Sequence, residues 1–203
     1  MIKKLIGLSV IFFFVVQPIL AQPTLTLEAF GGWLWTGSAG NNGSIKVDDK
    51  GNYGIRVGVS PMSEILVEFE WNHTDTRLQW NDFLSPTDFE EDVTFDYYMI
   101  GINKQMSEGP AIPYGLLNLG VLNVRGQTIN FSENWFVVGL GGGIKYYLSD
   151  KIGIRLQARI ILPMQFAGIG IGCGSGGCGG GISGYASTIQ GDFTGGVILK
   201  MGG

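Results

Sequence analysis

The sequence predicts an all-β protein, an eight-stranded antiparallel up-and-down transmembrane β-barrel. Apolar residues alternate with polar or small residues in eight stretches of about ten residues. Tight and long connections separate these stretches, and aromatic residues gather near their ends. Transmembrane barrels combine these features, because each strand faces lipid on one side and the lumen on the other.

The composition excludes several other classes of protein. Glycine makes up 34 of 203 residues, and 15 % of the residues are charged, against about 7 % and about 25 % in ordinary domains. Aromatic residues reach 12 %, too many for a disordered chain, and the glycines lack the period of collagen. No apolar run after the N-terminal segment reaches the ~18 residues of a transmembrane helix. The net charge of −4 argues against a nucleic-acid partner.

Residues 1–21 are interpreted as a cleaved signal peptide and 22–203 as the barrel. Two lysines precede an apolar stretch of 12 residues, which is too short to span a bilayer. Pro18 then breaks the segment, and Ala21 places a small residue at the cleavage position. Removal of two of the 13 basic residues leaves 11 against 17 acidic ones, a net charge of −6.

The first four predicted strands occupy 24–37, 52–59, 64–72 and 93–106. The second and third show a clear period of two, with apolar residues at every odd position from 53 to 59 and from 65 to 71. The fourth has two competing apolar sides, one with Phe95, Tyr97 and Met99 and one with Tyr98, Ile100 and Ile102. We expect a β-bulge in this strand to reconcile its two halves.

The other four predicted strands occupy 113–126, 136–146, 152–162 and 189–201. The alternation is clearest in 152–162, where every even position is apolar and Arg155, Gln157 and Arg159 lie on the opposite side. No segment shows a sustained helical period. The eight strands therefore suit either a membrane barrel or a secreted sandwich.

The lengths of the connections favour the barrel. Residues 60–63 and 149–150 form tight connections, whereas 38–50, 81–92 and 166–187 are long. Outer-membrane barrels have short turns on the periplasmic side and long loops on the extracellular side. We expect the same orientation here, with the N-terminus of the mature chain on the periplasmic side.

Aromatic residues are expected to form two belts at the two membrane interfaces. The outer belt would contain Trp33, Trp35, Trp71 and Trp135, together with Tyr53, Phe95, Tyr97 and Phe136. The inner belt would contain Tyr114, Tyr146 and Tyr147. Amphipathic rings favour the boundary between lipid and water, and a sandwich has no reason to arrange them in this way.

The face opposite the apolar one carries charged and small residues. Its charged residues are Glu28, Arg56, Glu68, Glu70, Asp96, Lys145, Arg155, Arg159, Asp192 and Lys200. In an eight-stranded barrel this face lines an interior that barely holds its own side chains. We therefore expect these acids and bases to pair in a plugged, polar lumen, since unpaired charges are costly to bury.

The two cysteines are interpreted as a disulfide. Cys173 and Cys178 lie close together in an exported chain, and strands seven and eight are expected to extend as a hairpin with this bridge at its tip. A zinc site would need about four ligands, whereas the chain offers two cysteines and only His73 as a histidine. The surrounding glycines do not form a nucleotide-binding loop, because no helix follows them.

The chain resembles the small eight-stranded outer-membrane β-barrels of the OmpA-like, porin-superfamily type. The resemblance is sharpest in residues 139–155, where a glycine-rich strand, the turn Tyr-Tyr-Leu-Ser-Asp and an alternating strand with arginine follow one another. The segment from Cys173 to Cys178 followed by residues 190–196 is similar to a subset of the family. Such barrels commonly finish on an aromatic residue, which assembly factors recognise, whereas this sequence finishes on Gly203.

The resemblance implies a protein of the outer membrane of a Gram-negative bacterium, with membrane lipid and lipopolysaccharide as its surroundings. Members of the family include anchors, adhesins, pores and, rarely, enzymes, so the fold does not choose a function. The plugged lumen favours a structural anchor or surface-interaction module without enzymatic activity or cofactor. The alternatives are a narrow passive pore, a lipid-modifying enzyme that uses His73 as a base, and an accessory subunit of a larger membrane complex.

Overall fold

The computed structural model describes residues 24–37, 45–62, 64–80, 89–127, 131–174, 177–186 and 189–201. The predicted signal peptide, residues 1–21, lies outside this part of the chain. Among the described residues, no helix has the length and apolar character needed to cross a membrane.

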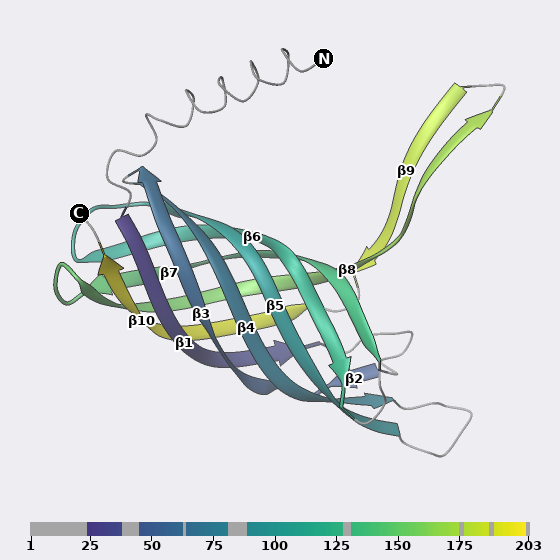
Figure 1. Cartoon of the computed structure of the whole chain (residues 1–203), viewed down its shortest axis with the longest axis horizontal. Helices are drawn as coiled ribbons and strands as arrows, with labels where there is room; N and C mark the ends of the chain where they lie inside the picture. Colours follow the sequence, from purple (N-terminus) through teal and green to yellow (C-terminus); the bar gives the residue numbers. More distant parts are fainter. Residues whose placement is uncertain are drawn as a thin grey trace, which may run out of the picture.

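Eight strands form a closed antiparallel barrel, as predicted (Figure 1). They are β1 (Thr24–Thr36), β3 (Lys50–Met62), β4 (Ile65–Trp80), β5 (Phe89–Gln105), β6 (Ala111–Gly126), β7 (Ser132–Tyr147), β8 (Ile152–Gly174) and β10 (Gln190–Met201). Each strand pairs with its neighbour in the chain, and β10 closes the barrel by pairing with both β8 and β1. Two further strands, β2 (Ile45–Val47) and β9 (Gly177–Ala186), lie beyond one end of the barrel.

Strands β4 and β5 run further than the sequence pattern predicts. β4 continues to Trp80 and β5 begins at Phe89, and the two remain paired over this whole length. The short strand β2 joins them by pairing with residues 78–80 of β4. The alternation ends earlier because the outer positions of these extensions are no longer apolar, so hydropathy alone does not mark where the pairing stops.

The predicted bulge in 93–106 is wrong. β5 pairs with both neighbours in continuous register, from Ile65↔Lys104 to Trp80↔Phe89 on one side and from Val93↔Gly126 to Gln105↔Tyr114 on the other. Both of its faces are apolar, because Phe95, Tyr97 and Met99 are buried inside the barrel while Tyr98, Ile100 and Ile102 face outward. A register shift occurs instead in the β3–β4 pair, between Val59 and Met62.

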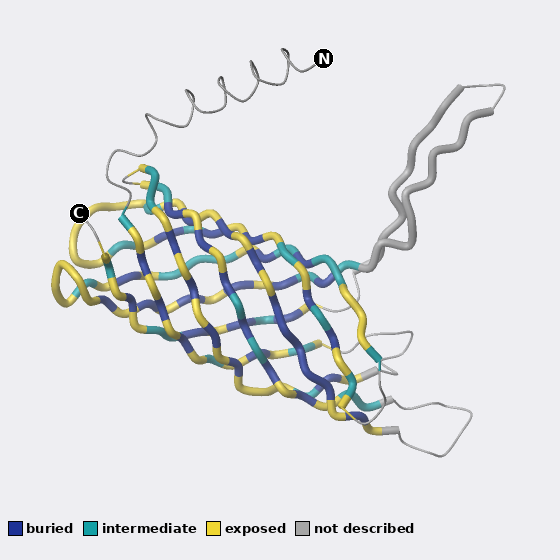
Figure 2. Tube along the Cα trace, in the orientation of Figure 1, coloured by how far each residue is buried: buried dark blue, intermediate teal, exposed yellow. Residues whose placement is uncertain are grey.

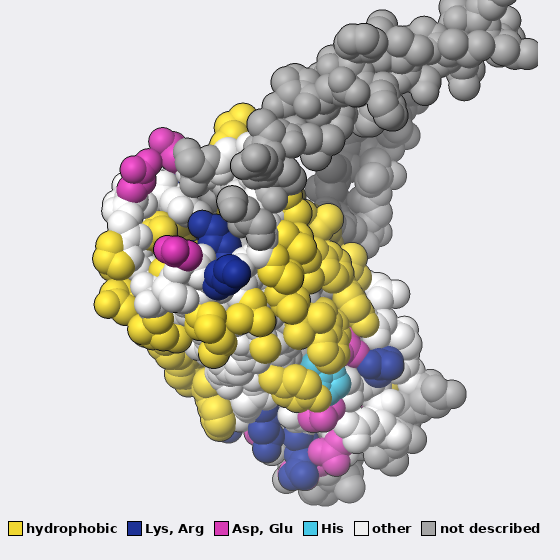
Figure 3. Space-filling view, turned by 60° about the vertical axis from the view of Figure 1, so that its left-hand side comes forward, with side chains coloured by type: hydrophobic (Ala, Val, Ile, Leu, Met, Phe, Trp, Pro, Cys, Tyr) yellow, Lys and Arg dark blue, Asp and Glu magenta, His cyan; other side chains and the backbone are white. Residues whose placement is uncertain are grey.

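The barrel exposes its apolar side chains and buries its polar ones. Along each strand buried and exposed residues alternate (Figure 2), and apolar side chains form a band across the face shown in Figure 3. Leu140, Ile100 and Ile160 are 66 %, 60 % and 54 % exposed, whereas Arg56 and Arg155 on the inside are 1 % and 2 % exposed. A water-soluble sandwich shows the reverse distribution, with apolar side chains buried and polar side chains exposed.

The aromatic residues divide between the two faces. Trp33, Trp35, Trp71 and Tyr146 lie on the outward face, as expected for belts. Five residues assigned to the belts turn inward instead: Phe95, Tyr97, Tyr114, Trp135 and Tyr147. The reason is the two-residue period of a strand, which places Tyr147 on the same side as the buried Lys145 and turns its neighbour Tyr146 outward.

The connections separate the barrel into two ends. The tight connections β3–β4 and β7–β8 lie at the same end as the termini of the barrel, and the β5–β6 connection, 106–110, lies there too. We call this the turn end. The opposite end, the loop end, carries β2, the extensions of β4 and β5, and β9.

A hairpin leaves the barrel at the loop end, in agreement with the expected extension. β8 continues past its last pair with β7 and pairs with β9 from Met164↔Ala186 to Gly174↔Gly177. The returning arm is β9, and the eighth barrel strand begins anew at Gln190. The backbone register sets Cys173 opposite Cys178. Their side chains lie outside the described part of the structure, so the disulfide stays a prediction.

Gly143 on β7 gives the first test of the packing inside the barrel. A Cβ atom at this position would lie 2.5 Å from the hydroxyl oxygen of the buried Tyr114 and would also meet the backbone of Leu156. We expect Gly143→Ala to reduce the free energy of unfolding by about 1–3 kcal/mol, as overpacking does elsewhere. Urea unfolding followed by tryptophan fluorescence would measure this change.

Gly115→Ala is the matched control, since a Cβ atom there would meet only the flexible end of Met106, at 3.4 Å. Equal stability of the two variants would contradict the close approach at Gly143.

Candidate functional site

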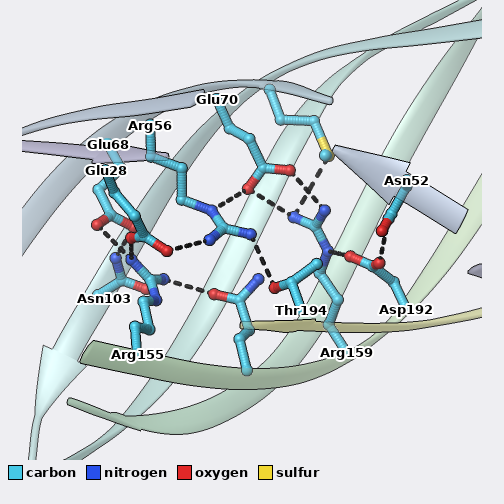
Figure 4. Close-up of polar contacts among 12 residues, drawn as sticks. Glu28, Asn52, Arg56, Glu68, Glu70, Asn103, Arg155, Arg159, Asp192 and Thr194 are labelled. Carbon is cyan, nitrogen blue, oxygen red and sulfur yellow. Dashed lines mark hydrogen bonds and ion pairs between the residues drawn. The ribbon is translucent and has the colours of Figure 1, made fainter. Parts of the chain in front are cut away.

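The lumen is the most elaborate polar site in the described part of the chain, and it has two layers. Toward the turn end lies a charged layer in which arginines from β3 and β8 meet carboxylates from β1, β4 and β10 (Figure 4). Toward the loop end lies an apolar layer, to which β1, β2 and β5–β8 contribute. Strand period and register bring these side chains together, because inward positions of neighbouring strands lie side by side.

Arg56 joins three strands on one side of the charged layer. Its Nη1 lies 2.6 Å from Glu28 Oε1, and its Nε lies 2.7 Å from Glu70 Oε2. Its Nη2 donates a hydrogen bond to Thr194 Oγ1 at 3.1 Å. The guanidinium also lies 3.7 Å from the centre of the Phe30 ring. These contacts hold the side chain in one orientation.

Arg159 binds the other edge of the same carboxylate. Its Nη2 lies 2.5 Å from Glu70 Oε1, and its Nη1 donates to Glu70 Oε2 at 3.0 Å. Its Nε lies 2.7 Å from Asp192 Oδ2, and Asp192 accepts a further hydrogen bond from Asn52 Nδ2 at 2.6 Å. Glu70 is therefore shared by two arginines and links β3, β4 and β8.

Arg155 completes the layer nearer the turn end. Its Nη1 lies 2.6 Å from Glu68 Oε1 and 3.0 Å from Glu28 Oε2. Its Nε donates to the hydroxyl of Tyr114 at 2.5 Å. Asn103 donates a hydrogen bond to Glu68 as well. Each oxygen of Glu28 thus contacts a different arginine, Arg56 or Arg155.

The charges of the layer balance. Its buried carboxylates are Glu28, Glu68, Glu70 and Asp192, and its buried cations are Arg56, Lys145, Arg155 and Arg159. Four negative and four positive groups give a formal charge of zero, as burial of so many ions requires. Lys145 differs from the arginines, because its Nζ has no hydrogen-bond partner among the described residues and lies 4.9 Å from the centre of the Tyr114 ring.

The apolar layer lies in the lumen on the loop-end side of the charges. It consists of Leu34, Val47, Val93, Phe95, Tyr97, Met99, Leu122, Val124, Val137 and Ile161, with Leu78, Phe131 and Trp135 packed against it. The hydroxyl of Tyr97 donates to Gln190 Oε1 at 2.7 Å, and Met99 Sδ lies 4.0 Å from Arg159 Nη1. The two layers are therefore in direct contact.

Two members of the expected lumen network lie elsewhere. Lys200 points inward but sits near the turn end, where its Nζ is 5.9 Å from the centre of the Tyr147 ring. Asp96 is on the opposite, outward face, because it stands one position away from the inward residues Phe95 and Tyr97 and directly opposite His73. The assignment of Asp96 to the lumen is therefore wrong.

Asp96 belongs to a polar cluster on the outer surface. Its Oδ1 lies 2.8 Å from His73 Nδ1 and accepts a hydrogen bond from Trp71 Nε1 at 3.3 Å. Its other oxygen accepts from Arg125. On the far side of the imidazole, His73 Nε2 lies 3.4 Å from Asp75 Oδ2.

The described neighbours of the His73 imidazole nitrogens are carboxylates. Both ring nitrogens of His73 lie near carboxylates, and no hydroxyl or thiol of a described residue is hydrogen-bonded to them. A general base must lie within hydrogen-bonding reach of the proton that it removes. Within the described residues, no group of three or more His, Cys, Asp and Glu side chains is placed to hold a metal ion.

No family model matches the chain, and no curated protein matches it. The chain does, however, align with several solved structures. Neisserial surface protein A aligns with a TM-score of 0.51 at 13 % identity, over 88 % of this chain and 97 % of its own. OprG from Pseudomonas aeruginosa, an outer membrane protein, aligns with a TM-score of 0.57 at 12 % identity, over 89 % and 96 %.

A major outer membrane protein from Thermus thermophilus is also similar, with a TM-score of 0.52 at 13 % identity, over 88 % of this chain and 99 % of that one. The chain has the fold of a small outer-membrane β-barrel. At these identities the similarity establishes the fold and not the role of the protein.

The alternation of residues does not by itself reveal the apolar layer of the barrel. The signal for it is the pair of competing apolar sides in 93–106, which the sequence analysis above interprets as a bulge. A strand with two apolar faces is what a barrel requires where the lumen is also apolar. Arg125 was missed as well, because its partner Asp96 lies two residues away from it in register, on the neighbouring strand.

Glu70→Gln tests the charged layer. The amide keeps the shape of the side chain but removes the charge that Arg56 and Arg159 share. Removal of one partner from a buried ion pair typically costs about 3–5 kcal/mol. We expect a loss of this size in the free energy of unfolding, measured by urea titration of the barrel in detergent micelles.

Glu90→Gln is the control, because Glu90 pairs with Arg77 on the exposed extension. Its urea midpoint should match that of the wild type. A Glu70→Gln barrel with an unchanged midpoint would show that the shared carboxylate does not stabilise the lumen.

Proposed function

We propose that the chain is an integral outer-membrane protein without enzymatic activity, a rigid anchor that holds a surface at its loop end. The observation that carries this proposal is the lumen, which is filled at two levels by its own side chains. A barrel closed in this way offers no route through the membrane. What remains available to partners is its outer surface and its extensions.

The proposed location is the outer membrane of a Gram-negative bacterium. The apolar band would face lipid, with lipopolysaccharide in the outer leaflet, since polarity of this kind requires a hydrocarbon environment. The turn end would face the periplasm and the loop end the exterior, in keeping with the usual lengths of turns and loops in such barrels. The extensions of β4 and β5 would then stand clear of the membrane.

A passive pore is the first alternative, and the lumen argues against it. Solute would have to displace both the arginine–carboxylate layer and the apolar layer. The first contains multiple ion pairs within hydrogen-bonding distance. The second holds Phe95, Tyr97 and Met99 in one buried apolar cluster with residues of β1, β2 and β6–β8.

A lipid-modifying enzyme is the second alternative, with His73 as its base. His73 does lie at the outer surface, where it could reach a lipid. Its Nδ1 lies 2.8 Å from Asp96 Oδ1, and its Nε2 lies 3.4 Å from the exposed carboxylate of Asp75. The described contacts of His73 include no hydroxyl or thiol that this base could activate, which favours the anchor.

Planar-bilayer recording tests the closed lumen. We expect the wild-type barrel to show no steady open channel. Tyr97→Ala should also remain closed, because it thins the apolar layer but leaves the charged layer intact. Steady channels of high conductance in the wild type would contradict the anchor and favour the pore.

Labelling of single cysteines on whole cells tests the proposed orientation. Lys46→Cys on β2 and Lys151→Cys in the β7–β8 turn both replace exposed residues at opposite ends of the barrel. A membrane-impermeant maleimide should label only the first, with the unmodified chain as the measure of background from its native cysteines. The reverse pattern would place the turn end outside.

A further inference from the structure

Three buried side chains on one side of the lumen carry polar atoms without a hydrogen-bond partner among the described residues. They are Asn52 of β3 and Asn72 and Thr74 of β4, and their exposed fractions are 4 %, 0 % and 1 %. The atoms concerned are Oδ1 of Asn52, both amide atoms of Asn72 and the hydroxyl oxygen of Thr74. We call these three residues the polar wall.

The strand register places the residues of the polar wall side by side. Tyr53 pairs with His73 in the antiparallel register of β3 and β4. Asn52 and Thr74 are the next residues toward the loop end, and Asn72 precedes His73 on β4. Alternate residues of a strand share a face, and inward neighbours on paired strands have Cβ atoms about 5 Å apart. The three side chains therefore face one small region of the lumen.

The polar wall lies at the boundary between the charged layer and the apolar layer. Glu70, the next inward residue of β4 toward the turn end, belongs to the charged layer. Tyr97, which pairs with Asn72, belongs to the apolar layer. Asn52 Nδ2 donates to Asp192 Oδ1 at 2.6 Å (Figure 4), so the polar wall is continuous with the charged layer.

The polar groups next to the wall are already engaged. Both oxygens of Glu70 contact arginines, and the hydroxyl of Tyr97 donates to Gln190. On β3 the ring of Phe30 covers Gly54, because a Cβ atom at Gly54 would lie 2.6 Å from Phe30 Cζ. Buried polar groups that lack a partner are costly, and in proteins such groups commonly bind an ordered water or an ion.

The chemistry of these atoms selects the ligand. Asn72 Nδ2 is a donor, the two amide oxygens are acceptors, and the hydroxyl of Thr74 is both, so the ligand must donate and accept. It must be neutral, because the four acids and four bases of the adjacent charged layer already balance. It must also be small, since the wall is buried between two filled layers. Water meets all three conditions, and a buried water typically makes about three hydrogen bonds.

We propose that the polar wall binds internal water in the lumen, between the ion pairs and the apolar layer. The inference goes beyond the proposed function, because it requires only the closed barrel and not the role of an anchor. Water bound here completes the hydrogen bonds of Asn52, which holds Asp192, the partner of Arg159. The hydrogen-bond network of the charged layer therefore continues through this water toward the loop end.

Nuclear magnetic resonance of the full barrel in deuterated detergent micelles tests the proposal on the unmodified chain. The protein is deuterated at carbon and labelled at its asparagine side chains. We expect the amide protons of Asn72 to show cross-peaks to water of opposite sign in NOE and ROE spectra, which distinguishes bound water from proton exchange. Asn103 is the matched control, because it is 1 % exposed and its amide donates to Glu68. Its cross-peak to water should be much weaker.

Thr74→Val tests the same site through stability, because valine keeps the shape of threonine and removes the hydroxyl. We expect the urea midpoint to fall and the water cross-peak of Asn72 to weaken. A hydroxyl without any partner would give the reverse, since its removal relieves a buried polar group. Thr194→Val is the reference for one lost hydrogen bond, because Thr194 is equally buried and accepts from Arg56. Both midpoints should shift in the same direction.

A missing water cross-peak at Asn72, or a midpoint that Thr74→Val leaves unchanged or raises, would overturn the proposal. A wild-type midpoint that is higher in sodium or potassium chloride than in choline chloride of equal ionic strength would also overturn it. That result would show that a metal cation, and not water, occupies the oxygen atoms. Each variant is first checked for the shift in electrophoretic mobility on boiling that a folded barrel shows, and the wild-type spectrum does not depend on any variant.

Discussion

The inward faces of eight strands must fill a lumen that only their own side chains can occupy, and the shared carboxylate of Glu70 shows how this is achieved. One carboxylate accepts two guanidinium groups, from Arg56 and Arg159, and so ties β4 to β3 and β8 across the barrel. Three arginines without such partners would be prohibitive to bury. The balance of four acids and four bases is therefore what allows these charges to be buried together in the lumen.

The space for these side chains comes from glycine. Gly143 faces inward beside Tyr114, and the absence of a Cβ atom lets the tyrosine ring lie against the strand, where its hydroxyl receives a hydrogen bond from Arg155. The high glycine content is thus partly a packing requirement of a narrow lumen. On the outside the same strands carry large apolar residues, so each strand combines a polar or small inner face with an apolar outer face.

The alternation of residues predicted the barrel, the strand count and the inward placement of most of the charges. It did not predict which acid meets which base, because the partners of Glu28 lie on β3 and β8 and depend on how the sheet is staggered when it closes. Two aromatic residues, however, could have been placed correctly from the local sequence alone. Tyr147 stands two residues from Lys145 and Trp135 two from Val137, so the two-residue period already assigned both rings to the inside. Asp96 was misplaced because β5 is apolar on both faces.

The contacts inside the barrel also affect the arrangement of its outer surface. The buried ion pairs tie several strands together, and the strand register then sets which side chains of the outer face lie side by side. His73 and Asp96 illustrate this, since their contact depends on the register of β4 and β5 and not on any local turn. The barrel therefore holds a defined array of polar groups at the edge of its apolar band. Its interior chemistry is what makes such an array possible.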